Sequence, residues 1–74
     1  MAFYELVNLS SGNRVGDYAT EHEALCDAWT AIQQRGPDAV ATIALGYEDE
    51  WGRGHIIAEG DELVSRARHQ FGSP

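Results

Sequence analysis

The segment from Thr20 to Pro37 constrains the fold most, because it contains a complete amphipathic helix with signals for both of its ends. Thr20 can accept a hydrogen bond from a backbone N–H of the first turn, and Glu23 can reach back to the Thr20 amide, which is the capping-box pattern. At the other end, Gly36 tolerates a positive φ and Pro37 cannot continue a helix. The sequence therefore predicts one long helix between two non-helical regions.

Apolar residues in this segment recur with the period of an α-helix. They line up on one face: Leu25, Ala28, Trp29 and Ile32. Polar residues fall on the opposite side: Asp27, Thr30 and Gln34. Because an amphipathic element must hide its apolar side against another layer, we expect the Leu/Trp/Ile face to pack on a small sheet.

Short runs of β-forming residues flank the helix on both sides. Residues 3–9 predict an inner strand, and residues 14–18 predict the return arm of a hairpin. After the helix, residues 38–47 predict a third strand and residues 55–59 a fourth. The polar, glycine-containing loop between them includes Trp51.

A second helix is predicted after Gly60, with Asp61 as its N-cap or first-turn acid. Its apolar residues share one face: Leu63, Val64, Ala67 and Phe71. The element order is ββαββα, which indicates an α+β fold. We expect a four-stranded, mainly antiparallel sheet with the long helix on one face and a short C-terminal helix. Residues 1–69 form a single compact domain in this interpretation, and residues 70–74 a frayed tail.

Both faces of the predicted sheet carry apolar side chains, because Phe3 and Val7 alternate with Tyr4 and Leu6 along the first strand. One long helix covers one face. The short helix or a second copy of the chain then covers the other, and the second case predicts a homodimer.

Acidic side chains dominate the composition, with 12 Asp and Glu against 5 Lys and Arg and a formal net charge of −7. This charge opposes binding to DNA or RNA, because neutralisation of phosphates supplies most of the non-specific affinity. It also disfavours an anionic membrane surface. Surplus acids keep a small protein soluble, and they also suit a partner with a basic surface.

A soluble, cytoplasmic protein is expected from several features. Cys26 is a single cysteine and cannot form an internal disulfide. The start of the chain does not resemble a signal peptide, and no stretch approaches the ~20 apolar residues that cross a bilayer.

Residues with catalytic or metal-binding chemistry form no complete pattern. His22 and Cys26 lie four apart on one helix face, but a zinc site needs four ligands, or three and a water. We expect an exposed His22 and a partly buried Cys26 instead. The serines lie outside any nucleophile elbow, and the glycines match turns better than a phosphate-binding loop. The sequence thus predicts no enzyme, no metal and no cofactor.

The loop between the third and fourth strands is the best candidate for a partner-binding site. Its candidate residues are Glu48, Asp49, Glu50, Trp51 and Arg53. Trp51 either folds back over the sheet to complete the core, which we favour, or stays accessible as an anchor for a partner. Arg53 can stack on Trp51 or pair with the acids.

A small basic cluster lies at the predicted end of the second helix. Arg66, Arg68 and His69 are interpreted as partners of the helix dipole, in preference to a nucleic-acid contact.

Residues 16–25 resemble the strand-to-helix junction of HicB-type antitoxins, small domains that block a toxin ribonuclease. The predicted order of elements differs from the three-strand start of that family, so no residue role is transferred.

Charge and missing catalytic patterns together favour a small acidic, non-catalytic interaction or regulatory module. It would bind a protein partner through the acidic loop and an exposed strand or helix surface. The alternative is a small-molecule-binding protein or minor enzyme, with a pocket between sheet and helix or at a dimer seam.

Overall fold

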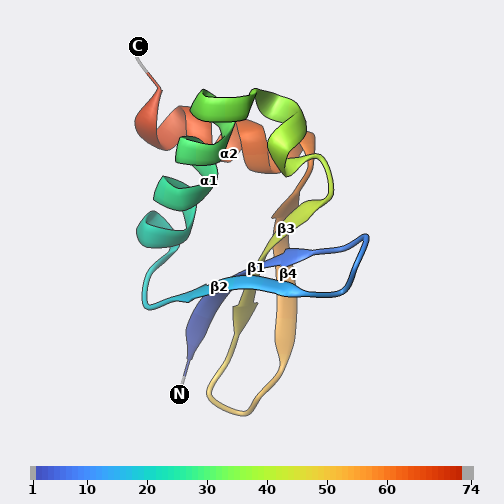
Figure 1. Ribbon diagram of the computed structural model, residues 1–74. Helices are drawn as coiled ribbons and strands as arrows, with labels where there is room; N and C mark the ends of the chain where they lie inside the picture. Colours follow the sequence, from blue (N-terminus) through green and yellow to red (C-terminus); the bar gives the residue numbers. More distant parts are fainter. Residues whose placement is uncertain (1, 73–74) are drawn as a thin grey trace.

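The computed structural model describes residues 2–72 and confirms the α+β fold (Figure 1). Its strands are β1 (Phe3–Asn8), β2 (Arg14–Tyr18), β3 (Ile43–Glu48) and β4 (Gly54–Glu59). Its helices are α1 (Glu21–Arg35), a short 3-10 helix η1 (Pro37–Val40) and α2 (Asp61–Phe71). The strands form one antiparallel sheet in the order β2-β1-β3-β4. No helix of the described residues is long and apolar enough to cross a membrane.

Both helices pack on the same face of the sheet, and the hydrophobic core lies between the two layers (Figure 1). Leucines from three elements are its largest fully buried side chains: Leu25, Leu45 and Leu63. Burying one such side chain contributes about 1.5–3 kcal/mol. The end of the sheet with the β3–β4 turn extends past the helices (Figure 1). The helix layer therefore covers one face only in part.

Helix α1 forms as predicted. The Thr20 hydroxyl oxygen accepts a hydrogen bond from the Glu23 backbone N–H at 3.2 Å. Glu23 completes the cap differently than expected, since its carboxylate accepts from the Thr20 hydroxyl at 3.3 Å. Gly36 adopts φ +88° after the last turn, and its N–H donates to the carbonyl of Ile32 at 2.7 Å. The predicted apolar face is directed inward: Leu25, Ala28 and Ile32 are buried, and Trp29 is half-buried against the core.

The third strand begins later than residues 38–47 predicted. Strand β3 starts at Ile43, and residues 37–40 form η1 instead. Pro37 explains the difference, because its fixed φ suits the first turn of a helix. Val40 of η1 is buried in the core, so its apolar character serves the helix layer and not the sheet.

Helix α2 shares the predicted face, with Leu63, Val64 and Ala67 buried. Gly60 is the N-cap at φ +54°, and Asp61 supplies negative charge in the first turn. The helix runs to Phe71. Of the tail predicted at residues 70–74, the first two residues thus belong to α2, and residues 73–74 lie outside the described part.

Helices α1 and α2 also contact each other through polar and aromatic side chains. Arg66 donates to the Glu21 carboxylate at 3.0 Å. The rings of His22 and Phe71 lie 4.8 Å apart, and His22 shares a hydrogen bond with Gln70 at 3.1 Å. These contacts join the start of α1 to the second half of α2.

Each edge strand carries one extra residue relative to its inner neighbour. In β2, Val15 is inserted between the residues that pair with Leu6 and Val7. In β4, Ile57 is inserted between the partners of Leu45 and Gly46. Such β-bulges interrupt the ladder and twist an edge strand, which makes addition of another strand less favourable.

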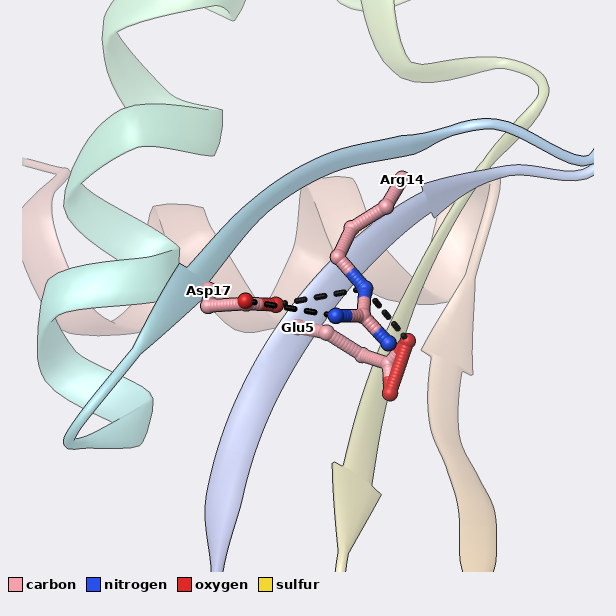
Figure 2. A network of polar contacts seen from close by, with 3 residues as sticks. All are labelled: Glu5, Arg14 and Asp17. Atoms are coloured by element: carbon pink, nitrogen blue, oxygen red, sulfur yellow. Dashed lines mark hydrogen bonds and ion pairs between the residues drawn. The ribbon is translucent and has the colours of Figure 1, made fainter.

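The other face of the sheet carries a polar network and no helix of the described residues (Figures 1 and 2). The Arg14 guanidinium lies 3.3 Å from the Asp17 carboxylate and 3.6 Å from that of Glu5. It also lies 5.5 Å from the centre of the Phe3 ring. We call this helix-free surface the open face. The homodimer that would cover it stays a prediction.

Candidate protein-interaction site

Asp49 holds the loop between β3 and β4 in a defined turn. One oxygen of its carboxylate accepts hydrogen bonds from the backbone N–H groups of Trp51 and Arg53, at 3.0 and 2.9 Å. Its own N–H donates to the Arg53 carbonyl at 2.9 Å, and the N–H of Gly52 donates to the Asp49 carbonyl at 3.0 Å. Gly52 adopts φ +82°, which a residue without a side chain reaches readily. The loop is therefore ordered by its own hydrogen bonds.

The same contacts keep Asp49 ionised. The hydrogen bond from the Arg53 N–H is the largest cause that lowers its pKa below the ordinary value of 3.8, followed by the Trp51 N–H and His55. The His55 ring nitrogen Nε2 lies 3.5 Å from the second carboxylate oxygen. Hydrogen bonds to a carboxylate favour its charged form. The centre of the loop thus carries a fixed negative charge near neutral pH.

Trp51 is 78% exposed, so the preferred prediction that it completes the core is wrong. The hydrogen bond to Asp49 fixes its backbone in the turn, at the end of the sheet that extends past the helices (Figure 1). The core is already filled by leucines such as Leu45, which is fully buried. Trp51 is therefore accessible from solvent.

The remaining charged candidate residues of the loop form no ion pairs with one another within residues 2–72. Glu48 is half-buried opposite Phe3, whereas Glu50 and Arg53 are exposed. Arg53 makes neither of the two contacts open to it from the sequence within residues 2–72: it does not stack on Trp51 and pairs with no acid. The loop thus presents free charges of both signs beside an exposed indole.

A row of aromatic side chains crosses all four strands on the helix-bearing side. Tyr18, Tyr4, Tyr47 and His55 lie opposite one another in successive strands. The ring centres of Tyr4 and Tyr47 are 5.0 Å apart, and those of Tyr47 and His55 are 6.5 Å apart. We call these four residues the aromatic row. Sequence reasoning missed it, because the row depends on the pairing register, and the only available signal was the frequency of tyrosine in predicted strands.

Tyr18 joins the aromatic row to α1 through a 2.8 Å hydrogen bond from its hydroxyl to the Asp27 carboxylate. Partial burial, this hydrogen bond and the nearby negative charges raise the Tyr18 pKa well above its usual range. The hydroxyl therefore remains protonated and keeps donating to Asp27.

Tyr18 also lines a groove of about 460 Å³ between the β1–β2 hairpin and α1. Its apolar lining includes Leu6 and Val15, and its polar lining includes Asn8 and Asp27. A concave site beside one of the tyrosines is therefore present.

The predicted metal-ligand pair has other neighbours. His22 packs on Phe71 and shares a hydrogen bond with Gln70, and Cys26 is exposed, whereas we expected it to be partly buried. Within residues 2–72, no group of three or more His, Cys, Asp and Glu side chains could hold a metal ion. The basic residues Arg68 and His69 lie in the last turn of α2, where the helix dipole favours positive charge.

Comparison with known proteins adds no functional information, since no family model, curated protein or solved structure matches this chain. The candidate site accordingly rests on its own geometry: an ordered acidic turn, an exposed tryptophan and an adjoining aromatic row.

Proposed function

We propose that the protein is a small acidic, non-catalytic interaction module that binds a protein partner through the loop Glu48–Arg53 and the adjoining strand surface. The exposed Trp51 carries this proposal. Tryptophan is the residue type most enriched among side chains that dominate binding energy, together with tyrosine and arginine. Because this indole is not buried in its own chain, it is available to be buried by a partner.

The order of the loop favours binding. Asp49 bonds to two backbone N–H groups and approaches His55, so the loop keeps its shape without a partner. Binding costs less conformational entropy when the binding segment is already arranged. Trp51 is thus presented on a prepared turn and not on a loop that must first fold.

Charge indicates the character of the partner. The chain has a net charge of −7, and the loop adds Glu48 and Glu50 beside Trp51. Complementary charge speeds association and selects partners, although it adds less to affinity than buried contacts do. A partner with a basic surface fits these features. The cytoplasmic location predicted from the sequence belongs to the same proposal.

Side-chain contacts are favoured over extension of the sheet. Val15 and Ile57 form bulges in both edge strands, which works against strand addition. The exposed side chains of the loop and its flanking strands therefore make the contacts in this proposal.

Affinity capture with matched variants tests the proposal. The immobilised protein is incubated with a lysate of its source cells, and retained proteins are quantified for wild type, Trp51→Ala and Leu9→Ala. Leu9 is a suitable control because it is 50% exposed in the other hairpin turn. We expect Trp51→Ala to lose a retained partner, by roughly tenfold or more, and Leu9→Ala to keep it. Equal retention by all three proteins would contradict the proposal.

The groove beside Tyr18 supports a second candidate function, the binding of a small molecule between sheet and helix. Its volume of about 460 Å³ lies within the range of ligand sites. Ligand-observed NMR with a fragment library tests it: binding that is lost in Val15→Asp and kept in Trp51→Ala supports this function. A library without any such fragment would count against it.

A further inference from the structure

Three side chains of the aromatic row are at least partly exposed to solvent. Tyr4 and Tyr47 are half-buried, and the His55 side chain is 58% exposed. Their rings follow one another from β1 to β4, with Tyr47 between the other two. Tyr18 differs, since its hydroxyl is bonded to Asp27 of α1.

Asp49 connects these rings to Trp51. Its carboxylate lies 3.5 Å from the His55 ring nitrogen and accepts a hydrogen bond from the backbone N–H of Trp51 at 3.0 Å. The indole therefore starts from a backbone position fixed next to the last ring of the row. We call Tyr4, Tyr47, His55 and Trp51 together the hairpin platform.

Carboxylates lie next to the hairpin platform, and Arg53 is the exposed cation of the same loop. Asp49 has a lowered pKa and stays ionised. Glu50 follows it in the turn, whereas Glu48 is paired with Phe3 and lies on the open face. Neither glutamate forms an ion pair within residues 2–72. Aromatic faces attract cations through their quadrupole, and carboxylates add direct charge attraction. Nucleobases would also stack on such rings, but the phosphates attached to them would be repelled by these acids.

On the open face, an arginine of the chain itself lies between carboxylates (Figure 2). Arg14 lies 5.5 Å from the centre of the Phe3 ring, and two carboxylates, those of Glu5 and Asp17, lie within 3.6 Å of its guanidinium. An aromatic ring with two nearby acids therefore holds an arginine in this protein. The hairpin platform offers rings and acids in the same combination, without an arginine of its own upon them among the described residues.

We propose that the hairpin platform binds arginine side chains of an extended basic segment in the partner. This inference rests on the proposed function and names the chemistry of its partner. Guanidinium groups stack flat on aromatic rings and pair with carboxylates in a forked geometry, whereas the lysine ammonium is a compact, strongly hydrated charge. Arginine therefore uses both features of the surface.

Calorimetric titration with two synthetic peptides tests the inference. The probes are an eight-residue peptide of alternating arginine and glycine and its lysine analogue, which has the same charge. We expect the arginine peptide to bind more tightly, by about threefold or more, because stacking adds to charge attraction. Equal affinity for both peptides would overturn the assignment to arginine.

Variants locate the contact. Trp51→Ala removes an exposed side chain and should weaken the arginine peptide about tenfold, whereas Leu9→Ala should leave its affinity unchanged. Tyr47→Leu keeps an apolar side chain and should also weaken binding. His55→Ala provides a second readout if Tyr47→Leu reduces the folded fraction seen by circular dichroism. Unchanged affinity in both Trp51→Ala and His55→Ala would overturn the inference.

NMR separates the hairpin platform from the open face. Addition of the arginine peptide should shift the ring signals of Tyr47 and His55 more than those of Phe3. Larger shifts at Phe3 would place the peptide on the open face and contradict the inference. Failure with peptides leaves the capture experiment free to succeed with a different kind of partner, so the inference and the proposed function fail separately.

Discussion

The turns of the two hairpins are held by the same kind of hydrogen bonds, but they carry different side chains. In the β1–β2 turn, the Asn8 side-chain oxygen accepts hydrogen bonds from the N–H groups of Ser10 and Ser11, at 2.9 and 3.2 Å. In the β3–β4 turn, Asp49 accepts two backbone N–H groups in the same way. Each turn also contains one glycine of positive φ, and each hairpin has its bulge on the edge strand.

What differs is the chemistry at the tip. The first turn reaches its shape with serines, so a turn of this kind needs neither acids nor a large aromatic residue. The second turn places Glu50 and Trp51 where the first has small neutral residues. Since a turn of similar construction forms without such side chains, Glu50 and Trp51 are the residues that the proposed function assigns to contact with a partner. The comparison thus separates the residues that build the turn from those that the proposal assigns to binding.

The largest effect is expected from truncating the leucine that each hairpin contributes to the core. Leu6 of β1 and Leu45 of β3 lie opposite each other and are both buried. We expect Leu6→Ala and Leu45→Ala each to lower the free energy of unfolding by about 2–5 kcal/mol. A domain of this size has a stability on the order of 4–11 kcal/mol in total, so either change should show clearly in urea unfolding.

Similar losses for the two leucines would support equal contributions of the hairpins to the core. If one variant loses several times more unfolding free energy than the other, the two hairpins do not contribute equally to the core. Val15→Ala serves as the control, since Val15 is exposed and its truncation should change stability little.

A smaller loss of stability, of similar size in both hairpins, is expected when the glycine of either turn is replaced. Gly12 has φ +76° and Gly52 has φ +82°, and an added Cβ would meet no atom within 4 Å at either position. Backbone strain alone should therefore decide the result, and we expect Gly12→Ala and Gly52→Ala each to cost about 1 kcal/mol. Melting temperatures should fall by roughly 4–8 °C. Thermal unfolding followed by circular dichroism measures this, and a loss in only one variant would show that the turns are built differently.

The smallest expected effect is the loss of the Asp49 hydrogen bonds in acid, which should occur in the β3–β4 turn but not in the β1–β2 turn. Asp49 has a folded-state pKa below its ordinary value of 3.8, so its contribution is fully present above that pH and is lost as the pH falls through the lowered pKa. Asn8 does not ionise in this range. Amide hydrogen exchange and NMR shifts should show the Trp51 and Arg53 amides released in acid while the Ser10 amide keeps its hydrogen bond. In Asp49→Asn the acid transition should disappear, and a transition that persists would assign it to another group.

Local signals predicted the helices well. The cap at Thr20, the stop at Gly36 and the apolar face of α1 depend on neighbours three or four residues away, which the sequence displays directly. The third strand was predicted too long, because Val40 has a β-forming side chain but follows Pro37 in a 3-10 turn. Propensity alone does not reveal which layer an apolar residue joins.

The candidate site was predicted only in part, for a different physical reason. The loop containing Trp51 could be chosen from its composition, but whether the indole turns inward depends on how full the core already is. The aromatic row depends on strand register, which bulges at Val15 and Ile57 displace by one residue. Both properties arise from tertiary packing, and a single sequence carries little trace of them.

The opposite placement of the two tips has a practical consequence. Asn8 pairs with the first residue of β3 and Phe3 with the last, so the two turns lie at opposite ends of the sheet. A fluorescent dye or a fused reporter inserted between Ser10 and Asn13 would sit away from Trp51. The protein thus contains its own attachment point for a sensor, one that leaves the end with the exposed indole unobstructed.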